Sequence, residues 1–289
     1  MAENHVLDVP ADRWVLLHFH IFKNAGSTID SILRRCLGPR FATLHGPTAD
    51  STLTGVQLAS FLAANPDIAA VSSHHLAYPF PQIPGIVLFD ICFLRNPLMR
   101  LWSMYRYMRA TDTSDHLAHC ARTTSAPEFF DLLLSGYPHL INDAQVNLLA
   151  NGRVYTRPPT AQDLRLAMGR ARQISVLGTV ELFDESAVTA EYFLRPTFPM
   201  VRFEHAAQNA SPPEHGAPSE EAFREAIGPA RFAQLEHMNR LDAHLLAFAK
   251  DELLRRFEMV PDRSRSLASL RARSKVLENV PAAALAGRG

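Results

Sequence analysis

The sequence predicts one α/β domain built on a central parallel sheet that helices cover on both faces. Short apolar runs with the β-branched and aromatic content of buried strands alternate with longer segments of helical character. This alternation favours parallel strands, because a chain that returns in the same direction needs a crossover, usually a helix. The 289 residues, 47% of them hydrophobic and 20% charged, are enough for one large buried core.

The first predicted strand covers residues 14–21, and a helix is predicted over 29–36. Between them lies the loop Phe22-Lys23-Asn24-Ala25-Gly26-Ser27-Thr28. At such a strand-to-helix connection, unpaired backbone N–H groups and the positive end of the helix dipole converge on one position. The glycine lets an anion approach the backbone, the two hydroxyls can donate, and the lysine adds a mobile charge. The loop therefore predicts a site for a phosphate or sulfate ester.

This loop does not follow the Walker A pattern, in which lysine comes after the second glycine and directly before Ser or Thr. Here Lys23 precedes the single glycine of the loop, Gly26, which disfavours ordinary nucleoside-triphosphate binding. The alternative interpretation is a structural joint with an incidental lysine, since short Gly/Ser loops after strands are common.

The next predicted helix covers residues 50–65, with Asp or Thr as its cap, and it closes before Pro66. A second strand is predicted in the apolar run that starts at Ile68 and ends in Ser-Ser-His74-His75.

The third strand is predicted over residues 86–94, a nearly continuous apolar run suited to burial on both faces. It ends at Arg95, and the following Asn-Pro pair predicts the cap and first position of a helix over 97–110. A charged residue that ends a buried strand needs a partner or a ligand. Arg95, with Ser103 about two turns into the helix, therefore predicts a second anion site. The alternative is an arginine paired with an acid.

The rest of the chain adds a fourth strand over 174–179 and a possible last strand over 200–203. A loop rich in Pro is predicted over 209–219, and the tail from 260 onward is expected to hold one loose helix and a frayed end. The further helices are predicted over 126–135, 142–150, 161–172, 185–194, 219–227 and 232–257.

Three strands thus deliver Lys23, His75 and Arg95 to their carboxyl ends, the edge at which open α/β sheets bind ligands. Residues 19–28 resemble the 5′-phosphosulfate loop of the carbohydrate sulfotransferases that use 3′-phosphoadenosine 5′-phosphosulfate (PAPS). Residues 93–105 resemble their 3′-phosphate motif, in which an Arg and a Ser flank a Pro and a second Arg at this spacing.

A third segment, residues 74–78, is similar to the one that carries the catalytic histidine in the uronosyl 2-O-sulfotransferase branch. Weaker similarities at 176–186 and 239–245 extend the resemblance over about residues 14–250. Two positions depart from the family pattern: Phe22 stands where Pro is usual, and Ser27 where Thr is common.

The resemblance implies a P-loop-like sulfotransferase domain over 14–257, between an N-terminal extension (1–13) and a C-terminal tail (258–289). It implies PAPS as co-substrate, a carbohydrate or other hydroxyl-bearing acceptor, and no metal. His75 would be the general base, with the adjacent His74 as the alternative, and Lys23 would stabilise the departing phosphate. The remaining cofactor-binding positions would be Asn24, Ala25, Gly26, Ser27 and Thr28 for the phosphosulfate, and Arg95 and Ser103 for the 3′-phosphate.

The formal net charge is zero, so no overall field recruits nucleic acid, and anion recognition must be local. No stretch reaches the length of a membrane span, and the first 13 residues lack the apolar core of a signal peptide. These features predict a bacterial cytoplasmic enzyme. Three cysteines without metal spacing fit free thiols in a reducing compartment.

Other interpretations stay open. The same anion-binding loop suits a kinase-like phosphotransferase, or a nucleotide-binding module without catalysis in which His75 is structural. His116, His119 and Cys120 have helical spacing that could ligate zinc, although no second ligand cluster accompanies them. His18 and His20 share one strand face and are expected to be buried, hydrogen-bonded structural histidines. His205, Asn209 and Ser211 fall where the resembled family closes a loop over the nucleotide.

Overall fold

A computed structural model describes residues 13–48, 51–205 and 219–278 of the chain. Its centre is a five-stranded sheet in the order β2-β3-β1-β4-β5, with every neighbouring pair parallel. The predicted α/β domain with a central parallel sheet is therefore confirmed. The strands are β1 (Arg13–Phe19), β2 (Phe41–Thr43), β3 (Ala70–Ser73), β4 (Ile86–Leu94) and β5 (Val176–Thr179).

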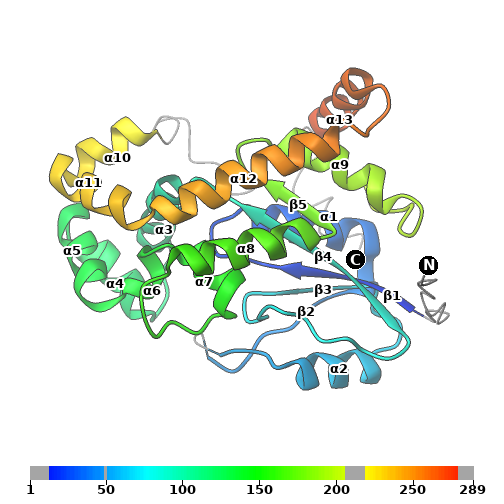
Figure 1. The fold of residues 1–289 in the computed structure, drawn as a ribbon, viewed down its shortest axis with the longest axis horizontal. Helices are drawn as coiled ribbons and strands as arrows, with labels where there is room; N and C mark the ends of the chain where they lie inside the picture. The colour runs from blue at the N-terminus through cyan, green and yellow to red at the C-terminus, as the bar shows by residue number, and fades with distance from the viewer. Residues whose placement is uncertain (1–12, 49–50, 206–218, 279–289) are drawn as a thin grey trace, which may run out of the picture.

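Helices connect and cover these strands (Figure 1). In chain order they are α1 (Gly26–Leu37), the short 3₁₀ turn η1 (Gly38–Arg40), α2 (Gly55–Ala64), α3 (Pro97–Ala110), α4 (His116–Thr123), α5 (Ala126–Gly136), α6 (Pro138–Ile141), α7 (Ala144–Asn151), α8 (Ala161–Gln173), α9 (Phe183–Leu194), α10 (Glu220–Ile227), α11 (Pro229–Met238), α12 (Arg240–Phe257) and α13 (Arg263–Glu278).

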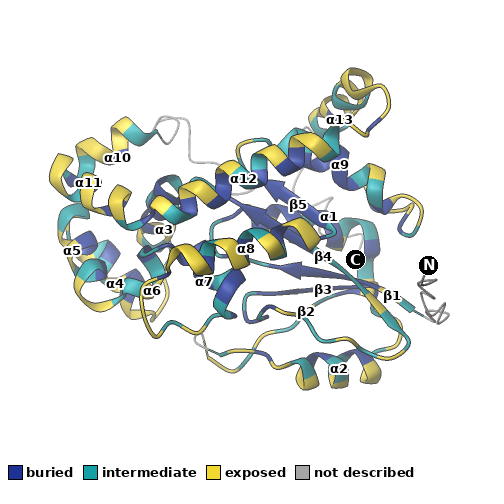
Figure 2. Ribbon diagram, in the orientation of Figure 1, coloured by how far each residue is buried: buried dark blue, intermediate teal, exposed yellow. Residues whose placement is uncertain are grey.

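Toward the carboxyl ends of its strands the sheet is buried, as Figure 2 shows by the dark strand ends and by helices whose outer sides are exposed. On β1, Leu16 joins a cluster with α1, α9 and α13, whereas Val15 and Leu17 join a cluster with α2, α7, α8 and α12. Alternate side chains of a strand point to opposite faces, so a strand buried twice needs an unbroken apolar run. This explains the sequence of β1.

A third hydrophobic cluster lies outside the sheet layers, between α3, α4, α5, α6, α10 and α11. Aromatic side chains dominate it, among them Tyr105, Phe129, Phe130 and Phe223, which are almost fully buried. These helices gather at the end toward which β1 runs, on the left of Figure 1. They therefore stand beside the carboxyl ends of the strands, where the site residues are predicted.

Near the sheet, the structure has one strand that was not predicted and lacks one that was. β2 was not predicted, because three residues after the 3₁₀ turn carry no periodic signal. Residues 200–203 form no strand. There the backbone N–H of Arg202 donates to the Cys36 sulfur, and that of Phe203 donates to Glu191, so side chains take the place of a strand partner.

The C-terminal third also differs. The helix predicted over 232–257 is two helices, because Asn239 ends α11 and its side-chain amide donates to the carbonyls of Ile141 and Leu235. The helix expected to be loose in the tail is packed: Leu270 of α13 is fully buried, and Arg273 pairs with Glu191 of α9.

Two further observations concern the cysteines and the apolar length of the described helices. Cys36, Cys92 and Cys120 are free thiols, as expected. None of the helices in the described part of the chain is long and apolar enough to cross a membrane.

Candidate active site

The strand order creates a topological switch point at the carboxyl ends of β1 and β4. These strands are neighbours, yet the chain leaves β1 toward β2 on one side and leaves β4 toward β5 on the other. The two loops therefore diverge, and open α/β sheets bind ligands at such a switch point. Lys23 lies in the loop after β1, and Arg95 directly follows β4.

Lys23 is held in an unusual backbone conformation beside aromatic rings. Its φ is 67°, a left-handed value that costs a residue other than glycine about 1–2 kcal/mol. Its Nζ lies 4.2 Å from the ring centroid of Tyr107 on α3. Burial, and then the positive charge of Arg95, lowers the pKa of Lys23 to about 8. Backbone strain of this kind gathers at functional sites, because surrounding structure must maintain it.

Arg95 lies against the same loop: its Nη1 donates to the Lys23 carbonyl oxygen at 2.9 Å. Burial lowers the pKa of Arg95, and the carboxylate of Glu181 opposes that shift. Neither cation forms an ion pair with a carboxylate among the described residues. The Lys23 loop and the end of β4 thus bring together two half-buried cations that have no ion-paired carboxylate among the described residues.

Several residues of the loop after β1 make structural contacts in addition to the N–H groups expected to bind an anion. The Asn24 amide is buried and donates to Phe93 O and to Gln145 Oε1, both at 2.8 Å. A Cβ on Gly26 would lie 1.9 Å from the imidazole of His20, so this glycine is required by a neighbouring ring rather than by a ligand. Ala25 has a φ of 60° and immediately precedes α1.

The first turn of α1 carries the donors that the sequence predicted. Thr28 is buried and its N–H donates to the Ala25 carbonyl, whereas Ser27 is exposed. The N–H groups of Gly26 and Ser27 make no hydrogen bond with any described residue. At a helix N-terminus such groups are available to an anion, and the helix dipole favours one.

His75 follows β3 and is buried. Its Nδ1 accepts the backbone N–H of Gly46 at 2.7 Å. A neutral imidazole protonates only one nitrogen, so this bond places the proton on Nε2. His75 can therefore donate from Nε2 in this arrangement but has no lone pair there to accept a proton.

His74 has the opposite tautomer. Its Nδ1 lies 3.0 Å from the carbonyl oxygen of His20, which can only accept, so Nδ1 carries the proton and Nε2 carries the lone pair. Burial, and then the neighbouring His20, lowers the pKa of His74 to about 3 and keeps the ring neutral. The Phe22 ring contacts both His74 and Tyr107, which links His74 to the Lys23 loop.

His18 and His20 are hydrogen-bonded structural histidines, as predicted. Their Nδ1 atoms lie 2.8 and 3.1 Å from separate oxygens of Asp30 on α1, and His18 also contacts Ser72 on β3. These two hydrogen-bonded partners hold the pKa of Asp30 far below its usual range, although burial opposes the shift. The three side chains are close enough together to ligate a metal ion, yet the hydrogen bonds already account for their geometry.

The other predicted residues lie on α3 and α4. Ser103 is half-buried on α3, and its hydroxyl makes no hydrogen bond with a described residue. Arg100 is buried and donates to the Leu140 carbonyl, so it links α3 to α6. In α4, His116 and Cys120 are 3.6 Å apart, and no third ligand joins them within the described ranges.

The expected closing loop is only partly described. The ring of His205 packs on Phe183, and its Nε2 lies 3.9 Å from Asp184. Asn209 and Ser211 lie outside the described residues.

Sequence reasoning missed Gln145, the second residue of α7. Its amide contacts Asn24 and the backbone of Arg95, so it links the loop of Lys23 to the end of β4. No local pattern marks such a residue, because its partners are 121 and 50 positions away in the chain. The only sequence signal is a polar residue on the buried side of a helix.

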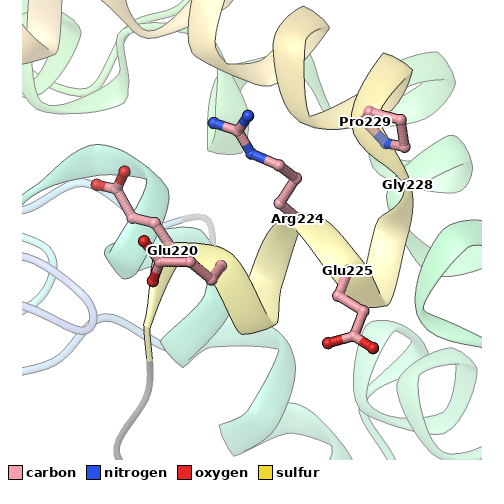
Figure 3. A pocket seen from close by; sticks show the side chains of 6 residues that line it. Glu220, Arg224, Glu225, Gly228 and Pro229 are labelled. Atoms are coloured by element: carbon pink, nitrogen blue, oxygen red, sulfur yellow. The ribbon is translucent and has the colours of Figure 1, made fainter.

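Two surface hollows are lined by residues other than Lys23, Arg95 and the two adjacent histidines. One is at the amino ends of the strands, around Arg13, Arg40 and Phe198. The other surrounds the turn between α10 and α11, where Glu220, Arg224 and Glu225 point in different directions (Figure 3). Converging polar groups mark a binding site, and the labelled charged side chains of this second hollow do not converge.

Comparison with known proteins leaves the family open. No family model matches the chain. The chain is similar to an uncharacterised protein of Archaeoglobus fulgidus, with 26% identity over 192 residues, which cover 65% of this chain and 76% of the relative.

Proposed function

We propose that this protein is a PAPS-dependent sulfotransferase that moves a sulfuryl group to a hydroxyl of a carbohydrate or glycoconjugate. One observation carries the proposal: Lys23 and Arg95 lie together at the switch point of a parallel sheet, half-buried and without an ion-paired carboxylate among the described residues. Two unneutralised cations repel each other, and an anionic ligand between them would remove that penalty. The resemblance of residues 19–28 and 93–105 to the PAPS motifs supports PAPS as that anion.

Each group has a role in the proposed reaction. The acceptor oxygen forms a bond to sulfur while the bond from sulfur to the 5′-phosphate oxygen breaks, which releases 3′,5′-ADP. Lys23 and the free N–H groups of Gly26 and Ser27 stabilise the charge that develops on the departing phosphate. Arg95 and Ser103 bind the 3′-phosphate.

The proton of the acceptor needs a base with a free lone pair. The tautomers favour His74 over the sequence-predicted His75, because only the Nε2 of His74 is unprotonated in the neutral ring. A pKa of about 3 makes His74 a weak base before the ligand binds. The negative charge of bound PAPS would raise this pKa and strengthen the base in the complex.

A ligand panel tests the proposal and separates the alternatives. PAPS and 3′,5′-ADP should raise the melting temperature, as they would for a non-catalytic nucleotide-binding module, whereas Mg²⁺ with ATP should stabilise a kinase-like enzyme. Turnover of PAPS with sugar acceptors then distinguishes the enzyme from the module. A kinase is disfavoured because the strand carboxylate Asp90 is occupied by hydrogen bonds from Tyr78 and Ser175.

A further inference from the structure

Gln145 uses both ends of its side-chain amide to connect the two loops of the candidate site. Its Oε1 accepts the backbone N–H of Arg95 at 3.0 Å and the amide N–H of Asn24 at 2.8 Å. Its Nε2 donates to the carbonyl of Arg95 at 2.8 Å and to Asp242 at 3.3 Å. The side chain is 1% exposed, so loss of these bonds would leave buried polar groups unpaired.

These bonds take over where the strand ladder ends. The paired residues of β1 and β4 run from Arg13 and Ile86 only as far as His18 and Ile91. Beyond that point, the loop after β1 is tied to β4 by Asn24 and Gln145 and by the bond that Arg95 makes to it. The spacing between the two cations therefore depends on side chains.

Gln145 is itself fixed by a pair of buried carboxylates. Asp242 of α12 accepts the backbone N–H groups of Gln145 and Val146 at the start of α7. In return, Asp143 accepts the backbone N–H of Asp242 at the start of α12. The two helix N-termini cap each other, which places Gln145 on a rigid base.

We propose that Gln145 is a positioning residue that holds the loops of Lys23 and Arg95 at the spacing needed for both cations to bind one nucleotide. This inference rests on the proposed anion site. Without Gln145, mutual repulsion between the cations is no longer opposed by its bonds to the two loops, and they separate. The affinity for the anion then falls. The burial and the nearby Arg95 charge that lower the pKa of Lys23 are also lost.

The titration of Lys23 tests this inference without any ligand. The chain has only three lysines, Lys23, Lys250 and Lys275, so reductive ¹³C-methylation gives few lysine signals and each can be assigned by substitution. In the wild type, Lys23 should titrate near pH 8. In Gln145→Met, its pKa should rise toward the ordinary lysine value of about 10.4.

Gln162→Met is the matched control. Gln162 is also the second residue of its helix, α8, but it is exposed, so this variant should titrate and bind like the wild type. If Gln145→Met does not fold, Gln145→Asn decides: it keeps an amide that is one methylene too short to reach both loops. A folded variant in which Lys23 still titrates at the wild-type pH would overturn the inference.

Binding of 3′,5′-ADP provides the second readout. Both Gln145 variants should weaken it by at least tenfold, and Gln162→Met should not. A variant with a lower melting temperature but unchanged affinity would show that Gln145 supports only the fold. Failure of the wild type to bind 3′,5′-ADP would instead count against the proposed function, while the lysine titration would still decide the role of Gln145.

Discussion

Lys23 combines a positive φ, an aromatic neighbour and a like-charged neighbour, and each of these affects its charge or position. Lys23→Ala should lower kcat more than tenfold and weaken nucleotide binding less, because the charge it meets develops mainly in the transition state. Steady-state kinetics together with calorimetry separate these two effects. Lys250→Ala is the control, and wild-type turnover in Lys23→Ala would remove Lys23 from the mechanism.

The pKa of Lys23 also gives a pH dependence with a definite sign. Only the protonated amine carries the charge, and its population falls as pH rises through about 8. We expect kcat/KM to decrease above that pH. Lys23→Arg keeps its charge over the whole range, so the decrease should disappear in this variant. An unchanged alkaline decrease in Lys23→Arg would assign it to another group.

The two adjacent histidines can be separated by the same kinetics. If His74 is the base, His74→Ala should keep 3′,5′-ADP binding and lose about 10²–10⁴-fold in turnover. His75→Ala should lose less, because its Nε2 carries a proton in the neutral ring. A greater loss in His75→Ala would restore the assignment predicted from the sequence.

At the scale of elements, the joint between β1 and α1 depends on the packing of Gly26 against His20. A Cβ at Gly26 would lie 1.9 Å from that ring, so Gly26→Ala must displace the imidazole and its bond to Asp30. We expect a loss of about 1–3 kcal/mol in unfolding free energy. Chemical denaturation of Gly26→Ala, His20→Ala and the double variant tests this, because removal of the ring should make the glycine substitution nearly neutral.

The mutual capping of α7 and α12 predicts a pH-dependent stability. Burial and the negative charge of Asp242 raise the pKa of Asp143 to about 7. Between the unfolded value of about 3.9 and this folded value, the folded protein binds more protons than the unfolded chain. The contribution of Asp143 to unfolding free energy should therefore decrease as pH rises from about 4 to 7.

Asp143→Asn removes that titration while it keeps an oxygen that can cap α12. Urea unfolding across the same pH range should show the variant gaining stability relative to the wild type as pH rises. The exposed Asp251→Asn on α12 should follow the wild-type curve. Parallel curves for Asp143→Asn and the wild type would contradict the assigned pKa.

At the scale of the whole molecule, the sequence predicted what local patterns determine. The long apolar run of β4 and the polar residues that end β1 and β4 were sufficient to predict a parallel sheet with Lys23 and Arg95 at one edge. The three-residue β2 was missed, since its pairing with β3 depends on tertiary contacts. The place of Gln145 in the site and the tautomers of the two histidines could not be predicted either, because hydrogen bonds between distant segments determine them.

The most direct test of the central claim is calorimetry with 3′,5′-ADP and 5′-AMP on the wild type and Arg95→Ala. If Lys23 and Arg95 form a PAPS site, the wild type binds 3′,5′-ADP more tightly than 5′-AMP, because only the former carries a 3′-phosphate. Arg95→Ala should then lose about 1.5–3 kcal/mol of binding free energy for 3′,5′-ADP and little for 5′-AMP. Equal affinity of the wild type for the two nucleotides, or tighter binding of ATP with Mg²⁺, would contradict it.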